Sequence, residues 1–328
     1  MKIYKATVKN INIAAKLLLK GGIVSFPTET VYGLGALACN KEAIERVYKV
    51  KGRPKNNPLI VHVYNLEQIL SITENIPNEA YKLIGKYWPG PLTLILKYKN
   101  SSNISSIARA NLKTVAVRIP NHPVALKLLK VVNQPLIAPS ANISEHLSPT
   151  KASHVLNDLG NNLNDKKDMI LDGGSTSIGI ESTVIDFTGN KPTVLRPGGL
   201  NITPINKYVK VSYIESNANN TTPISPGLFK KHYAPNSSLR LNAKFPLEGE
   251  AWLGFGKDPK NIDNFTKMNL SLTADLDEAA MNLFAMLRLL DKKNIKKIAI
   301  KEIPNRKIGI AINDRLIRGS SNNLDLNH

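Results

Sequence analysis

The 328-residue chain has a single cysteine, Cys39, and only 6% aromatic residues. One cysteine excludes an internal disulfide framework and a multi-cysteine zinc site, so we interpret Cys39 as a packed thiol. No apolar run approaches the roughly 20 residues that span a bilayer. Lysines interrupt the apolar residues of the N-terminus, unlike the pattern of a signal peptide. These absences predict a soluble, cytoplasmic protein with no membrane partner.

Several motifs of nucleotide and metal chemistry are also missing. No glycine-rich segment ends in Gly-Lys-Ser or Gly-Lys-Thr, which excludes a P-loop. Gly33-Leu34-Gly35 lacks the third glycine of a dinucleotide-binding fingerprint. The six histidines lack the spacing of a zinc protease, and we predict no metal site in the protein.

Acidic residues are scarce, with 25 against 44 basic residues and a net charge of +19. A basic surface attracts phosphate backbones, so an RNA-binding module without catalysis is one hypothesis. The alternative is a compositional background, because lysines outnumber arginines by 34 to 10 and form no dense run with aromatic residues.

Length predicts about two domains, and composition predicts a globular protein. Over residues 1–207, short aliphatic or β-branched runs alternate with helical patterns, which predicts a mixed, twisted sheet of about seven strands with flanking helices. Helices are expected after caps at Asn10 and Asn40, and over residues 124–132 and 151–159. The runs that we interpret as strands are 23–26, 59–63, 92–96, 115–119, 136–138, 169–171, 183–187 and 193–195.

The pattern changes in the last third of the chain. A polar stretch at 215–226 predicts a long linker, which we place at residues 208–235. Residues 236–328 then predict a smaller α/β domain. Its expected elements are strands at 251–255, 295–300 and 308–312 and a helix over 276–290.

Polar residues recur where the predicted strands end, and ligands of α/β sheets bind at such ends. Residues 1–207 hold only five arginines, and Arg53, Arg118 and Arg196 all lie in these segments. A guanidinium group suits bidentate carboxylate or phosphate contacts, which lysine cannot copy. Each segment alone also fits turn or capping chemistry, and His62 alone fits a core histidine. Their order along the chain favours a shared site.

The first domain carries these segments in a fixed order. They are Pro-Thr-Glu-Thr-Val-Tyr-Gly-Leu-Gly (27–35), Lys-Gly-Arg-Pro (51–54), Asn-Pro-Leu-Ile-Val-His-Val (57–63), Trp-Pro-Gly-Pro-Leu-Thr (88–93), Val-Ala-Val-Arg-Ile-Pro (115–120), Pro-Ser-Ala-Asn (139–142), Glu-Ser-Thr-Val (181–184) and Leu-Arg-Pro-Gly (195–198). This set resembles the YrdC-type threonylcarbamoyl-AMP synthases. Lys-His-Tyr-Ala-Pro (231–235) and Gly-Ile-Ala-Ile-Asn-Asp-Arg (309–315) resemble the linker and tail of the long, two-domain form. The resemblance implies a YrdC-like fold followed by a Rossmann-like C-terminal domain.

The resemblance also implies an activity. Such a nucleotidyltransferase combines L-threonine, bicarbonate or CO2, and ATP into threonylcarbamoyl-AMP and pyrophosphate, with Mg²⁺ carried by ATP. The product would serve a tRNA-modifying transferase machinery that makes threonylcarbamoyladenosine next to the anticodon, and any RNA contact would be weak. A hydrolase of carbamoyl-phosphate-like compounds shares the core domain. It would need acylphosphatase and zinc-finger modules, for which this chain has neither the length nor the cysteines.

Site residues follow from the resemblance, motif by motif. The expected catalytic residues are Lys51, Arg53 and Arg118. The threonine pocket would consist of Thr28, His62, Arg118, Ser182 and the backbone of Ala138, with Arg118 on the threonine carboxylate. The ATP side would consist of Lys51, Arg53, Lys55, Thr114, Ser140, Asn142, Ser148 and Arg196, with Tyr233 folded over the nucleotide. Glu29 and Glu181 could act as acids or bases, but we favour structural roles for them.

Overall fold

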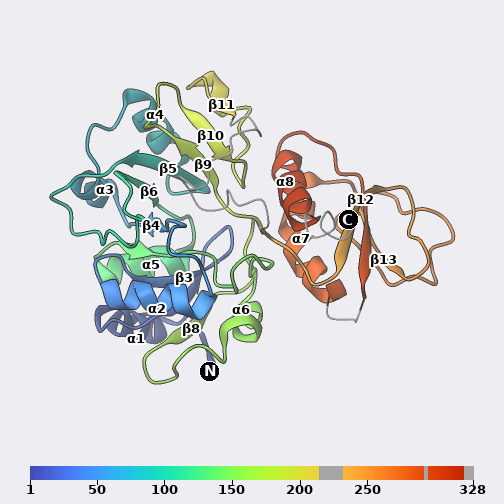
Figure 1. The fold of residues 1–328 in the computed structure, drawn as a ribbon, viewed down its shortest axis with the longest axis horizontal. Coiled ribbons are helices and arrows are strands. Elements are labelled where there is room, and N and C mark those ends of the chain that lie inside the picture. Colours follow the sequence, from blue (N-terminus) through green and yellow to red (C-terminus); the bar gives the residue numbers. More distant parts are fainter. Residues whose placement is uncertain (214–231, 292–294, 321–328) are drawn as a thin grey trace.

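The computed structural model describes residues 1–213, 232–291 and 295–320, so the predicted linker stretch 215–226 lies outside the described residues. The described residues form two α/β units, each with its own sheet and helices (Figure 1). The mixed α/β fold predicted from the sequence is confirmed. The domain boundaries at residues 207 and 235 stay predictions.

The larger unit is built on one eleven-stranded sheet with the order β1-β8-β2-β3-β7-β4-β6-β5-β9-β10-β11. Parallel and antiparallel pairs are mixed: β4 is parallel to β6, whereas β5 is antiparallel to it. The strands are β1 (Ile3–Lys5), β2 (Val24–Pro27), β3 (Tyr32–Leu37), β4 (Ile60–His62), β5 (Leu92–Lys97), β6 (Thr114–Arg118), β7 (Leu136–Ile137), β8 (Met169–Asp172), β9 (Thr183–Asp186), β10 (Thr193–Arg196) and β11 (Ser212–Tyr213).

The predicted count of about seven strands was too low, because β1, β3 and β11 were not predicted. β1 and β11 are edge strands of three and two residues, too short to show a period. β3 is fully buried but contains Gly33 and Gly35, residues that the sequence pattern associates with turns.

Helices cover both faces of the large sheet. One face is packed by α1 (Val8–Leu19) and α5 (Pro123–Val132), whose apolar residues share a core with β2, β7 and β8. The other face is covered by α2 (Lys41–Lys51), α3 (Leu66–Ile72), α4 (Asn78–Tyr87) and α6 (Ala152–Leu159). A short 3-10 helix, η1 (Ile205–Lys207), precedes β11.

One predicted helix cap is confirmed and one was wrong. The Asn40 side chain accepts a hydrogen bond from Ala43 N at 2.9 Å and begins α2. In α1 the cap is Thr7, whose hydroxyl accepts from Asn10 N at 3.2 Å. Asn10 lies inside the helix because the capping threonine stands three residues earlier, the usual spacing for this bond.

The smaller unit has a four-stranded, all-parallel sheet with the order β12-β15-β13-β14 and two helices, α7 and α8. Its elements are β12 (Ser238–Ala243), β13 (Glu250–Gly254), β14 (Lys267–Asn269), α7 (Leu276–Asp291), β15 (Lys297–Lys301) and α8 (Gly309–Ser320). The predicted strand at 308–312 was wrong, because these residues begin α8. The buried residues of α8 follow helical spacing and are Gly309, Ala311, Ile312, Arg315, Leu316 and Gly319. The alternating isoleucines at the start of the helix conceal this spacing in the sequence.

The two units meet through apolar and charged contacts. Val31, Leu147 and Ile180 of the larger unit belong to the apolar core of the smaller one. Arg288 of α7 forms a bidentate ion pair with Asp158 of α6, at 2.8 and 2.6 Å. Figure 1 accordingly shows α7 and α8 on the side of the small sheet that faces the large unit. None of the described helices is both long and apolar enough to traverse a bilayer.

Candidate active site

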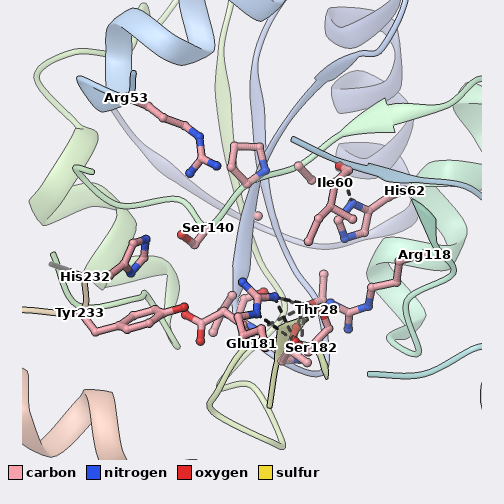
Figure 2. A pocket seen from close by; sticks show the side chains of 16 residues that line it. Thr28, Arg53, Ile60, His62, Arg118, Ser140, Glu181, Ser182, His232 and Tyr233 are labelled. Carbon is pink, nitrogen blue, oxygen red and sulfur yellow. Dashed lines mark hydrogen bonds between the residues drawn. The ribbon is translucent and has the colours of Figure 1, made fainter. Parts of the chain in front are cut away.

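A small cavity lies where strand ends of the large sheet meet the segment that precedes β12 (Figure 2). The parallel register of β4 and β6 places His62 beside Arg118, so the topology joins two motifs that are distant in sequence. Most of the residues predicted for the site line this cavity. They are Thr28, Arg53, His62, Arg118, Ala138, Ser140, Ser182, Arg196 and Tyr233.

The lining residues fall on two sides. Figure 2 shows Arg53, Ser140 and His232 on one side and His62 and Arg118 on the other. This division parallels the two groups of residues that the resemblance assigns to ATP and to threonine.

Arg118 is held at the end of β6 by three contacts. Its Nε donates to Gly90 O at 3.1 Å, and its Nη1 donates to Thr30 Oγ1 at 2.9 Å. Its Nη2 lies 2.6 Å from Glu29 Oε1 in an ion pair. Because a guanidinium has five N–H donors, these contacts fix its position and leave donors for a ligand in the cavity.

His62 is an uncharged neighbour of Arg118. Burial, and next the charge of Arg118, lowers the pKa of His62 to about 3. Its Nδ1 lies 3.3 Å from Ile60 O. The imidazole is therefore neutral near pH 7, and Arg118 carries the positive charge on this side of the cavity.

Arg53 and Arg196 supply further positive charge to the cavity lining. Arg53 Nη2 contacts Asn57 Oδ1 at 2.5 Å and Pro58 O at 2.9 Å, and burial lowers its pKa to about 10. Arg196 Nε donates to Ser182 O at 3.1 Å. Both guanidinium groups stay charged near pH 7, so the cavity suits an anionic ligand.

Lys51 stands behind the cavity wall. Its Nζ donates to Ser140 O and Asn142 O, at 2.6 Å each. Burial, followed by the charge of Arg53, holds its pKa well below the ordinary lysine value. Asn142 in turn donates through Nδ2 to His146 O at 2.8 Å. The structure thus gives Lys51 and Asn142 contacts that shape the loop bearing Ser140, and their predicted contact with ATP stays a prediction.

Three further predicted residues also stand outside the cavity wall. The Lys55 side chain is 66% exposed and pairs with Glu45 at 3.6 Å. Thr114 begins β6 and so lies about 13 Å along the strand from Arg118. Ser148 is buried and donates a short hydrogen bond to Glu181. For these residues, too, contact with ATP stays a prediction.

His232 and Tyr233 close the cavity from the side of the smaller unit. Tyr233 is buried, has a φ of 62°, and stacks on Phe284 of α7 with ring centroids 5.7 Å apart. Positive φ is uncommon in a bulky residue and is often found at functional sites. Burial, and next Arg53, lowers the pKa of His232, whereas burial raises that of Tyr233. Among the described residues, Tyr233 Oη and His232 Nδ1 have no hydrogen-bond partner.

The residues missed as site residues include Thr30 and His232, which line the cavity, and Arg315, which contacts its wall. Arg315 of α8 donates through Nε to Glu181 Oε2 at 2.9 Å, and Glu181 lines the cavity. The motif at 309–315 contains this arginine. The position of Arg315 between the apolar residues Ile312 and Leu316 is a sequence signal for a buried ion pair. A charged residue on the apolar face of a helix needs a buried partner.

Within the described ranges, no group of three or more His, Cys, Asp or Glu side chains could hold a metal ion. Fold and site together define a two-domain α/β protein with a buried, cationic pocket for small molecules.

Comparisons with known proteins extend this class to a family. Residues 16–198 match a family model described as "Telomere recombination", and residues 200–321 match one described as "Threonylcarbamoyl-AMP synthase, C-terminal domain". The threonylcarbamoyl-AMP synthase of Pyrococcus abyssi is 38% identical, covering 94% of each chain. That of Bacillus subtilis is 37% identical, covering 94% of this chain and 92% of its own. A crystal structure of P. abyssi Sua5 complexed with L-threonine has a TM-score of 0.87 at 36% identity, covering 97% of this chain and 96% of that one.

The chain belongs to the threonylcarbamoyl-AMP synthase family.

Proposed function

We propose that this protein is the enzyme that makes threonylcarbamoyl-AMP and pyrophosphate from L-threonine, bicarbonate or CO2, and ATP. The observation that carries the proposal is the cavity lining: three arginines, Arg53, Arg118 and Arg196, with Glu181 as the one carboxylate among the lining residues. This surplus of positive charge suits an amino-acid carboxylate together with a triphosphate.

Threonine binds on the side of His62 and Arg118. Arg118 receives the carboxylate, because its position is fixed and it retains donors toward the cavity. The buried hydroxyls of Thr28 and Ser182 are suited to the polar groups of the substrate. The L-threonine bound to P. abyssi Sua5 in its crystal structure supports this choice of amino acid.

ATP binds on the opposite side with its phosphates toward Arg53 and Arg196, and Mg²⁺ enters as part of the ATP complex, since phosphate oxygens are ligands that it prefers. The threonine amine attacks CO2 and loses a proton, giving a carbamate. A carbamate oxygen then attacks the α-phosphorus, and the bond to the bridging oxygen breaks as pyrophosphate leaves. Such a step depends on positioning and on cationic stabilisation of the phosphates, and this cavity offers both.

Entry of ATP requires His232 and Tyr233 to move. The cavity has a volume of ≈ 50 Å³, room for about three or four waters, whereas sites for molecules of this size have about 300 Å³ or more. Tyr233 then folds back over the bound nucleotide and keeps water from the reactive product.

The product is a mixed anhydride, so a second enzyme must take it up. We assign this role to the tRNA-modifying transferase machinery that acts next to the anticodon. The charge of +19 supports a weak, salt-dependent contact with RNA. A cytoplasmic location stays a prediction from the sequence.

The decisive experiment is pyrophosphate release with ATP, Mg²⁺, bicarbonate and L-threonine, compared with the same mixture without threonine. We expect release that depends on both threonine and bicarbonate. Arg53→Gln should abolish it, whereas Arg306→Gln, which removes an equal charge at an exposed position, should leave it unchanged. Equal pyrophosphate release with and without threonine would reject the proposal and favour the RNA-binding hypothesis.

A further inference from the structure

One arginine of the smaller unit contacts the wall of the cavity. The Arg315 side chain on α8 is 1% exposed, and it crosses the interface between the two units. Its Nε donates to Glu181 Oε2 at 2.9 Å, and its Nη1 donates to Pro197 O at 2.7 Å. Both acceptors belong to segments that bear cavity residues, since Glu181 precedes Ser182 and Pro197 follows Arg196.

Glu181 is an unusual residue for this wall. It is the one carboxylate among the cavity-lining residues, it is buried, and it stands on the wall that also carries Arg196 and Tyr233. An uncompensated carboxylate there would repel a triphosphate, and low exposure to water strengthens that repulsion. Ser148 donates a hydrogen bond to Glu181 but brings no charge. Arg196 of the same wall also interacts with Glu181 through its charge, but the ion pair that holds the carboxylate comes from the second unit.

Two more contacts tie α8 to the same wall. The Arg315 guanidinium lies 5.0 Å from the centre of the Tyr233 ring. A Cβ added at Gly319, one turn further along, would lie 2.8 Å from Tyr233 O, so the helix backbone runs directly against Tyr233. Asp314, 2.7 Å from Arg315 Nη1, and Arg318, 2.9 Å from Asp314, continue the line of alternating charges toward the surface.

We propose that Arg315 is a positioning residue for the ATP side of the cavity: it neutralises Glu181 and fixes its carboxylate, so that the C-terminal unit contributes to nucleotide binding. The inference rests on the proposed function and deepens it. Arg315 itself contacts no substrate; it acts through Glu181.

If Arg315 only held the two units together, removing the charge of Glu181 as well would not restore ATP binding. The variants therefore remove the charge of each partner separately and then of both. Arg315→Gln removes the charge, Glu181→Gln removes the charge that it balances, and the double variant removes both. Arg240→Gln is the control, because Arg240 is likewise paired with a glutamate: it forms two hydrogen bonds to Glu250, at 2.9 and 2.6 Å, within the small sheet. Binding of ATP with an uncleavable α,β-methylene group and binding of L-threonine are measured separately by calorimetry, with pyrophosphate release measured in parallel.

We expect Arg315→Gln to weaken ATP binding by about tenfold or more and to change threonine binding by less than about threefold. The double variant should recover to within about threefold of the unaltered protein, and Glu181→Gln alone should bind ATP at least as well as the unaltered protein. Arg240→Gln should match the unaltered protein.

Undiminished ATP binding in Arg315→Gln would overturn the inference, as would a double variant no better than the single one. If Arg315→Gln does not fold, weaker ATP binding by Glu181→Gln would overturn it instead, because that variant keeps Arg315. If the unaltered protein neither binds ATP nor releases pyrophosphate, the proposed function itself fails and this inference falls with it.

Discussion

Arg118 and Glu29 form an ion pair in which both side chains are nearly fully buried, at 4% and 6% exposure. Removing one partner of such a pair leaves an uncompensated buried charge, a larger loss than removing both. Arg118→Gln should therefore lower the free energy of unfolding by about 3 kcal/mol, and Glu29→Gln/Arg118→Gln by clearly less. Denaturant titration measures both.

The same two variants separate stability from binding. Both lack the proposed contact with the threonine carboxylate, so both should raise the KM for threonine by about tenfold to a hundredfold, at saturating ATP. A double variant that is stable and has an unchanged KM for threonine would remove Arg118 from the threonine site.

His62 makes stability depend on pH. In the folded protein its pKa is about 3, whereas in the unfolded chain it is about 6.5. Between these values the unfolded chain binds more protons, so stability falls as the pH is lowered. From pH 7 to pH 5 the unaltered protein should lose about 2 kcal/mol more than His62→Asn. Parallel denaturation curves at the two pH values test this, and an equal loss in both proteins would contradict it.

At the residue scale, the three predicted arginines line the cavity and the predicted Lys51 does not. Arg53, Arg118 and Arg196 all line the cavity, because a chain that uses lysine for its surface retains arginine where several acceptors must be bound at once. Lys51 was predicted for the phosphates, but its Nζ binds two backbone carbonyls. Its sequence neighbours cannot reveal this, because the carbonyls of Ser140 and Asn142 arrive from a distant segment.

At the scale of elements, the loop after β10 approaches the start of β9 very closely. A Cβ added at Gly198 would lie 2.3 Å from Ser182 C and 2.4 Å from Glu181 O. Gly198→Ala should therefore push apart the segments that carry Arg196 and Ser182. The expected loss is about 1–3 kcal/mol of stability, together with a lower rate of pyrophosphate release.

Gly189→Ala provides the control, since nothing lies within 4 Å of a Cβ at that position. It should change stability by less than about 0.5 kcal/mol. If Gly198→Ala behaved like Gly189→Ala, the close approach would not shape the site.

Strand prediction succeeded where a short aliphatic run stands between breaking residues. The eight strands predicted in the larger unit all exist, because each is a buried aliphatic run between breaking residues. α8 was mistaken for a strand because its first residues alternate Ile with small residues, whereas the helical spacing appears only over the longer stretch that includes Leu316 and Gly319. The position of Arg315 on this apolar face indicates a buried partner, but no local pattern identifies that partner as Glu181.

At the scale of the whole molecule, the cavity depends on both units. A chain ending at Tyr213 keeps all eleven strands of the large sheet but loses Tyr233 and Arg315. It also exposes Val31, Leu147 and Ile180, each of which contributes about 1.5–3 kcal/mol when buried. We expect this fragment to be less stable and at least about tenfold slower in pyrophosphate release. Full activity in the fragment would reject a role for the second unit in closing the site.

The overall charge has little bearing on this architecture. The net charge of +19 describes the lysine-rich composition, whereas the positive charge of the cavity comes from three guanidinium groups in its lining. Length predicted the number of units, and the alternation of strand and helix patterns predicted the class of fold. Neither could predict the docking of the units, because Arg288 and Arg315 meet partners that lie more than a hundred residues away.

The small volume of the cavity also has a kinetic consequence. If His232 and Tyr233 swing out before ATP enters, as proposed above, association takes two steps, opening and then capture. In stopped-flow mixing, the observed rate should rise with ATP concentration and then level off at the opening rate of this segment. The plateau would measure how often the enzyme opens, independently of how tightly it holds its nucleotide.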